Sequence, residues 1–165
     1  MEVQLLRIDS RLLHGQVTTS WARALNIDYI IIASDSVAQD RIRQALMLQA
    51  APSHLKVSVT TIDSLIYNQN HPQLKGVKVM IIVETPRDAR RLVENGITID
   101  EVNIGSLSFQ TGSVMVTNTI AVTDNDVREF QWLHQHHIQL YMQKVATDIR
   151  KDFWPILVEK KHLKK

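Results

Sequence analysis

The sequence predicts an α/β fold in which a mostly parallel sheet lies between two layers of helices. Short runs rich in β-branched residues alternate along the chain with segments of helical periodicity. Two of these runs, residues 30–32 and 79–83, are apolar at every position, as is typical of strands that helices cover on both faces. A length of 165 residues suits one core, so we expect a single three-layer α/β/α sandwich over residues 1–165.

The expected elements follow this alternation in order. The predicted strands are residues 4–8, 29–33, 56–60, 78–83, 101–104, 119–122 and 139–143. A first helix follows the first strand, because Leu13, Val17, Trp21 and Ala24 share one helical face. Trp21 is therefore expected to pack against the sheet.

Capping residues mark the next helices. Ser36 begins a capping-box pattern for the second helix, and Pro52 ends it. Thr85 followed directly by Pro86 is a typical helix start, and Gly96 is a matching end.

Two later positions complete the helix predictions. Asp124 is expected to cap a helix that buries Val127 and Phe130, whereas Pro155 interrupts the last helical pattern of the chain.

Composition excludes several classes of protein. The absence of cysteine rules out disulfides and thiolate metal sites. The first residues reach a charge too early for a signal peptide, and the longest uncharged run, residues 102–123, is too polar to span a membrane. We therefore expect a cytoplasmic protein.

Charge and motifs argue against nucleic acid, nucleotides and metal ions. The net charge is +2, and much of the excess lies in the tail 160–165, which we interpret as a solvated end because aromatic residues are few. No Walker-type glycine loop is present. His134, His136 and His137 lack the spacing of metal ligands on one helical face. No cofactor is expected.

The most informative segment is residues 7–17, which read RIDSRLLHGQV. His14 stands where the first strand ends and the first helix begins, five residues after Asp9 and three after Arg11. A helix N-terminus carries free N–H groups and a partial positive charge, which favour a bound anion over an imidazolium. We hypothesise that His14 accepts a phosphoryl group there.

The neighbours of His14 suggest roles in this chemistry. Arg11 offers paired donors to phosphoryl oxygens, and the backbone N–H groups of Gly15 and Gln16 are plausible phosphoryl ligands. Asp9 either fixes the imidazole tautomer or holds Arg11, and the sequence leaves both roles open. Ligands of open α/β sheets bind beyond the carboxyl ends of the strands. On that rule the expected rim of the site consists of Ser10, Asp35, Gly105 and Ser106.

The segment 7–17, with Trp21 after it, resembles the signature RIDDRLIHGQ of the IIB components of the mannose–fructose–sorbose phosphotransferase family. The resemblance continues through residues 50–52, 76–80, 85–96 and 102–105, and so covers nearly the whole chain. Three departures are present. Ser10 replaces a second aspartate, residues 105–107 read GSL in place of GGM, and residues 143–146 read QKVA in place of RQVP.

The resemblance implies a cytoplasmic phosphocarrier. The histidine matching His14 accepts a phosphoryl group from phosphohistidine on the IIA component and passes it to a sugar carried by the IIC and IID membrane components. Such a protein is a protein-phosphohistidine–sugar phosphotransferase, which needs no metal or nucleotide and touches the membrane only through the transporter. In this reading Arg11 stabilises the phosphoryl group, and Asp9 orients either His14 or Arg11.

Two other classes of function remain open at this stage. One is an acid–base enzyme that uses Asp9 and His14 on a small phosphorylated metabolite held by Arg11. The other is a module that senses an anion or a partner through the same loop without any chemistry. The specific sugar and the phosphorylated nitrogen of His14 are not legible from the sequence.

Overall fold

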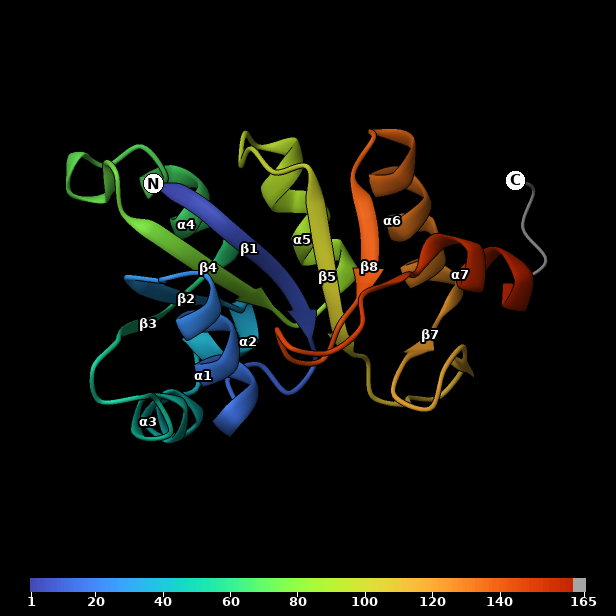
Figure 1. Ribbon diagram of the computed structural model, residues 1–165, viewed down its shortest axis with the longest axis horizontal. Helices are drawn as coiled ribbons and strands as arrows, with labels where there is room; N and C mark the ends of the chain where they lie inside the picture. The colour runs from blue at the N-terminus through green and yellow to red at the C-terminus, as the bar shows by residue number, and fades with distance from the viewer. Residues whose placement is uncertain (162–165) are drawn as a thin grey trace.

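The computed structural model describes residues 1–161 and confirms the three-layer α/β fold (Figure 1). Seven strands form the central sheet in the order β3-β2-β4-β1-β5-β8-β9. Neighbouring strands are parallel, except that β9 runs antiparallel to β8 at one edge. The strands are β1 (Glu2–Asp9), β2 (Tyr29–Ala33), β3 (Lys56–Thr60), β4 (Lys78–Val83), β5 (Glu101–Ser106), β8 (Gln139–Met142) and β9 (Lys151–Asp152).

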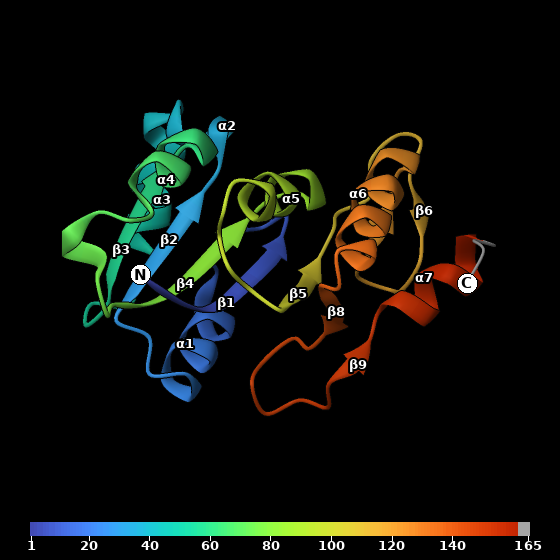
Figure 2. The ribbon, with the colours of Figure 1, turned by 90° about the horizontal axis from the view of Figure 1, so that it is seen from above.

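Helices cover both faces of the sheet. Figure 2 shows α1 on one side and α4, α5 and α6 on the other. The helical elements are α1 (Gly15–Ala24), α2 (Asp35–Ala38), α3 (Arg41–Gln49), α4 (Ile62–Asn68), the 3-10 turn η1 (Pro72–Leu74), α5 (Pro86–Glu94), α6 (Asp124–Gln135) and α7 (Trp154–Lys161).

The apolar strand patterns arise because these two helical layers bury both faces. In β2, Ile30 and Ile32 pack with the cluster under α1, whereas Ile31 packs with the larger cluster on the opposite face. All three side chains are at most 3% exposed. A strand buried on both sides gains by being apolar throughout, as the sequence predicted.

The central strand β1 brings several strand ends together. Ile8 pairs with Val83 of β4 and with Ile104 of β5, and Asp9 pairs with Ser106. The carboxyl ends of these three parallel strands therefore meet at one edge of the sheet, where the chain turns into α1.

The capping-box prediction at Ser36 was wrong. Ser34 caps α2 by accepting from the backbone N–H of Val37, and Asp40 caps a separate helix, α3. The Ser36 hydroxyl instead donates to the Glu84 carboxylate at 2.9 Å. A pattern of polar residues marks a cap only where the backbone is extended, and this condition is met at Ser34.

The start of α5 is as predicted. Thr85 accepts from the backbone N–H of Asp88, and Pro86 occupies the first turn. Beyond the C-cap Asn95, Gly96 has a φ of +99°, a conformation that ends helices and favours glycine.

Later boundaries shift by one residue or change character. Thr123 rather than Asp124 caps α6, in a capping box with Asp126. Pro155 lies in the first turn of α7, where its missing N–H has no helical partner to lose, so it does not interrupt the helix. The strand expected at residues 119–122 shortens to β7 (Ala121–Val122), which pairs antiparallel with β6 (Val114–Met115) outside the main sheet.

The basic tail expected to be a solvated end lies partly beyond the described chain, because residues 162–165 are outside it. Within residues 1–161, no helix combines the length and the apolar character needed to cross a bilayer.

Candidate functional site

His14 lies at the junction of β1 and α1, as its N-cap residue. No side chain caps this helix N-terminus, so the first N–H groups of α1, including those of Gly15 and Gln16, have no side-chain acceptor. Gly15 has a φ of +41°, which favours glycine. The junction is thus a site where an anion can accept backbone hydrogen bonds.

The turn that precedes His14 is stabilised by a backbone hydrogen bond and by two buried leucines. Leu12 adopts a φ of +58°, and its N–H donates to the Asp9 carbonyl at 2.9 Å. The side chains of Leu12 and Leu13 are at most 3% exposed and pack in the cluster under α1. Left-handed backbone is costly for leucine, and burial of both leucines offsets that cost.

Asp9 is the centre of the hydrogen-bond network. Its side chain is fully buried. Oδ2 accepts from Nε2 of His14 at 3.1 Å and from Nη2 of Arg7 at 2.9 Å. Oδ1 accepts from the Ser106 hydroxyl at 2.8 Å, from the Arg11 backbone N–H at 3.0 Å and from Arg11 Nε at 3.4 Å. One carboxylate therefore contacts both groups that the sequence offered as alternatives.

These contacts keep Asp9 ionised. Burial alone would raise its pKa, but the hydrogen bond with His14, the charge of Arg7 and the hydrogen bond from Ser106 together lower the pKa below its usual range. An ionised carboxylate only accepts hydrogen bonds, so the proton between Asp9 and His14 belongs to Nε2. In the neutral ring, Nδ1 then carries the free lone pair.

Arg7 is a site residue that the sequence analysis missed. Its side chain is 1% exposed, and besides Asp9 it contacts the Asn103 side chain and the Gln143 carbonyl. Burial lowers the pKa of Arg7, while the charge and hydrogen bond of Asp9 raise it. A signal was present, because positions i and i+2 of a strand share a face, and Arg7 stands in an apolar strand two residues before Asp9.

A cavity of about 540 Å³ opens beside His14. Its basic side chains come from Arg11 and Lys144. Arg11 is half exposed, and its Nε is bound to Ser106 at 3.1 Å. The complete lining is Arg11, His14, Gly15, Gln16, Val17, Lys144, Val145 and Asp148. Two basic residues and a helix N-terminus near one imidazole can bind the oxygens of a phosphoryl group.

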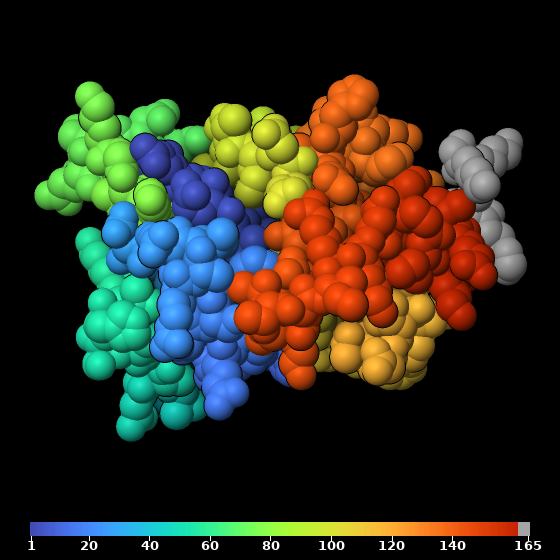
Figure 3. Space-filling view, viewed as in Figure 1, coloured from blue at the N-terminus to red at the C-terminus, as the bar shows by residue number. Residues whose placement is uncertain are grey.

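The segment after β8 closes one side of this cavity. In Figure 3 the orange-red chain beyond β8 lies directly against the blue residues of α1. Trp21 donates from Nε1 to the Lys144 carbonyl at 3.1 Å, and the Ala146 N–H donates to the Ser20 hydroxyl at 3.2 Å. Trp21 is buried, as predicted, and it also positions the backbone that carries Lys144.

The expected rim residues divide between the site and other contacts. Ser106 and Gly105 lie beside Asp9 and Arg7. Ser10 accepts from the Ser108 N–H at 3.0 Å, which ties the loop to the end of β5. Asp35 does not join the rim as expected, because its carboxylate accepts from the Ile62 N–H at 2.9 Å and pairs with Arg91 at 2.7 Å. Arg91 of α5 and the backbone N–H of Ile62, the first residue of α4, therefore hold the Asp35 carboxylate away from the expected rim.

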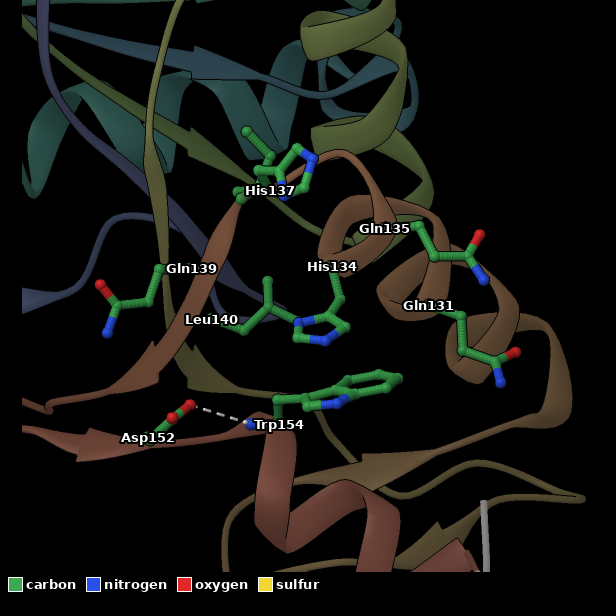
Figure 4. Close-up of a pocket in the computed structure, with 9 residues that line it drawn as sticks. Gln131, His134, Gln135, His137, Gln139, Leu140, Asp152 and Trp154 are labelled. Carbon is green, nitrogen blue, oxygen red and sulfur yellow. Dashed lines mark hydrogen bonds between the residues drawn. The ribbon is translucent and has the colours of Figure 1, made fainter. Parts of the chain in front are cut away.

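The histidine-rich segment lies at another cavity, of about 620 Å³, between α6, β8, β9 and α7 (Figure 4). There the His134 ring stacks on the Trp154 indole with 4.1 Å between centroids. His136, which does not line this cavity, stacks on Trp132. Among residues 1–161, no three histidine or acidic side chains converge to hold a metal ion.

Comparison with known proteins adds to this geometry. Residues 3–165 match the family described as "PTS system sorbose subfamily IIB component". The mannose-specific EIIAB component of Escherichia coli (strain K12) is 39% identical over 148 residues, which are 90% of this chain and 46% of that protein. The chain thus spans a little under half the length of that relative.

Two similar proteins match this chain over nearly their whole length. The sorbose-specific EIIB component of Lacticaseibacillus casei is 38% identical over 152 residues, 92% of this chain and 93% of that protein. The IIBSor domain of the sorbose permease from Klebsiella pneumoniae has a TM-score of 0.92 at 32% identity, covering 96% of this chain and 98% of that chain.

Proposed function

Because the chain belongs to the sorbose subfamily of phosphotransferase-system (PTS) IIB components, we propose that His14 is its phosphoryl acceptor. In this proposal the IIA component supplies the group from a phosphohistidine. His14 then passes it to a sugar of the mannose, fructose or sorbose class that the IIC and IID membrane components carry. The protein acts in the cytoplasm and meets the membrane through those components.

The observation that carries this proposal is the contact of 3.1 Å between His14 Nε2 and the buried carboxylate of Asp9. From this contact we infer that the ring carries its proton on Nε2 and that Nδ1 is the nucleophile. When Nδ1 forms its bond to phosphorus, the ring becomes positively charged while it keeps its Nε2 proton. The negative charge of the Asp9 carboxylate, held next to Nε2, stabilises this positive charge on the ring.

The rest of the site acts on the phosphoryl oxygens. Phosphoryl transfer depends mainly on positioning and on stabilising the charge of the oxygens in the transition state. Gly15, Gln16, Arg11 and Lys144 line the cavity at His14, and in this proposal their backbone N–H groups, guanidinium and ammonium bind the phosphoryl oxygens. These groups stabilise the transferring group without a metal ion or a nucleotide.

The bonds and charges balance in both steps of the proposed relay. In the first step a nitrogen–phosphorus bond breaks in IIA and one of the same kind forms at His14 Nδ1. In the second step the sugar hydroxyl attacks phosphorus, the bond to Nδ1 breaks, and the ring returns to its neutral form with the Nε2 proton in place. The hydroxyl proton leaves to solvent or to a base outside this chain.

The test is phosphorylation from radiolabelled phosphoenolpyruvate with the general carriers and a cognate IIA, comparing wild type with His14→Gln and with His134→Gln as a matched control. We expect acid-labile, base-stable label on the wild type and on His134→Gln, and none on His14→Gln. Equal label on His14→Gln would place the acceptor elsewhere. Label on none of the three, with IIA shown to be charged, would favour the metabolite enzyme or the sensing module.

A further inference from the structure

A buried cation lies in the middle of β1. Arg7 is 1% exposed between Leu6 and Ile8, which are both 0% exposed. A guanidinium removed from water costs much free energy unless its N–H groups are paired and a counter-charge is near. The contacts of Arg7 therefore explain why a charge is kept at this position.

The guanidinium of Arg7 joins two parts of the site. Nη2 donates to Oδ2 of Asp9 at 2.9 Å, the same oxygen that accepts from His14. Nη1 donates to the Gln143 carbonyl at 3.1 Å and also contacts Oδ1 of Asn103. Asn103 donates to the same Gln143 carbonyl at 3.1 Å. Gln143 is the residue from which the chain leaves β8 toward Lys144.

This connection crosses the intervening strand. In the sheet β5 lies between β1 and β8, and Gly105 of β5 lies beside the guanidinium. A Cβ at Gly105 would overlap the Arg7 guanidinium and the Asp9 carboxylate. Gly105 has no left-handed backbone to explain it, so the room it leaves for Arg7 is the reason for glycine there.

We propose that Arg7 is a positioning residue that couples the histidine loop to the residue 143–148 segment across β5. At one end it holds Asp9 Oδ2 where this oxygen accepts the hydrogen bond from Nε2 of His14. At the other end it fixes the start of the segment that places Lys144 at the cavity. This role rests on the proposed phosphoryl chemistry for its purpose, but the positions it fixes exist in the free protein.

The coupling requires arginine in particular. Its two η nitrogens form a rigid fork that reaches the carboxylate and the carbonyl at the same time. A lysine ammonium keeps the charge but is a single point, so it reaches one end at a time. Arg7→Lys therefore separates the charge of Arg7 from its geometry.

The experiment compares wild type with Arg7→Lys, Gly105→Ala and the milder Asn103→Ser. Arg90→Lys serves as control, because Arg90 pairs with Glu94 within α5, outside both the histidine loop and the residue 143–148 segment. Nitrogen-15 NMR of the His14 ring at neutral pH reports the tautomer, and amide hydrogen exchange reports the residue 143–148 segment. Phosphoryl acceptance from IIA reports the consequence.

We expect the wild type and Arg90→Lys to hold the Nε2–H tautomer. Arg7→Lys and Gly105→Ala should populate the Nδ1–H tautomer, exchange the amides of residues 143–148 faster, and accept phosphate about 10- to 100-fold more slowly. Asn103→Ser should speed exchange in that segment alone. Folded variants that keep the wild-type tautomer and exchange rates would overturn the coupling, even if their melting temperature is lower.

The design separates this proposal from the one on which it rests. The tautomer and exchange measurements need no IIA, so they decide the coupling whether or not the protein is phosphorylated. If phosphorylated IIA does not phosphorylate the wild-type protein, that result would contradict the phosphocarrier proposal and leave the coupling untouched. If Gly105→Ala fails to fold, Arg7→Lys and Asn103→Ser still decide the outcome.

Discussion

Two cavities of similar size contain histidine but differ in chemistry. The one at His14 has a volume of about 540 Å³, and the one at His134 about 620 Å³. His14 contacts the fully buried carboxylate of Asp9, whereas His134 stacks on the indole of Trp154. The acidic residue lining the second cavity, Asp152, is exposed on β9 and accepts from the Trp154 N–H at 3.3 Å.

The difference suggests that buried charge, rather than cavity volume, is the better guide to the candidate site. A buried ionised carboxylate is costly, so its presence calls for a reason beyond stability. At the carboxyl edge Asp9 organises an imidazole and two arginines. In the second cavity His134 packs on Trp154, and the carboxylate of Asp152 is exposed to solvent. Such aromatic packing is typical of a structural contact.

Replacing the buried carboxylate that contacts His14, and in turn the Asp152 carboxylate that lines the second cavity, should separate the two regions most strongly. Asp9→Asn leaves Arg7 buried without its counter-charge and permits the wrong tautomer of His14. We expect it to lower the free energy of unfolding by about 3–5 kcal/mol and phosphoryl acceptance by about 100-fold or more. Asp152→Asn should change stability by no more than about 0.5 kcal/mol. Urea unfolding and the labelling assay measure both, and equal effects of the two variants would remove the distinction.

The stability of the first site should depend on acid. The pKa of Asp9 in the folded protein lies below its unfolded value of about 3.9. Its contribution to the free energy of unfolding is therefore complete above about pH 4 and is lost as the pH falls through the lower folded pKa. Urea unfolding across acidic pH should show this loss in wild type and in Asp152→Asn, but not in Asp9→Asn. A variant Asp9→Asn with the full wild-type acid dependence would assign it to other carboxyls.

Removing a cation from each region should have a smaller effect on transfer. Arg11→Gln keeps the Asp9–His14 contact but loses a charge at the cavity, and we expect phosphoryl acceptance to fall about 10-fold. Arg128→Gln on α6, the helix that carries His134, should leave the rate unchanged. Rapid-quench labelling measures these rates, and an unchanged Arg11→Gln would exclude Arg11 from stabilising the phosphoryl group.

The smallest effect is expected at the second cavity. His134→Ala removes the stack on Trp154, and we expect a loss of on the order of 1 kcal/mol in the free energy of unfolding. Phosphoryl acceptance should be unchanged. Thermal unfolding and labelling report the two quantities, and a variant that folds normally but fails to accept phosphate would show that this cavity takes part.

The sequence predicted the sheet well where burial alone decides the residues. The strands at residues 29–33, 56–60 and 78–83 match β2, β3 and β4 in their bounds. The strand expected at residues 119–122 failed as a member of the sheet, since so short a run gives little sign of its pairing partner. Ser36 failed as a cap because its hydroxyl is satisfied by Glu84, which is distant in the sequence.

The candidate site was predictable where its parts are adjacent in the chain. Asp9, Arg11, His14 and Gly15 all lie between the end of β1 and the start of α1, and the structure brings them together. Lys144 comes to the cavity only through the packing of the segment after β8 against Trp21 and Ser20, which no local pattern encodes. Asp35 was misplaced for the same reason, because Arg91 draws it toward α5.

The most direct measurement is NMR of the phosphorylated protein with nitrogen-15-labelled histidine, which identifies the nitrogen bonded to phosphorus. The Asp9 contact predicts phosphorus on Nδ1 of His14, with the proton retained on Nε2. Phosphorus on Nε2, or on any of the histidines at the second cavity, would contradict this reading of the site.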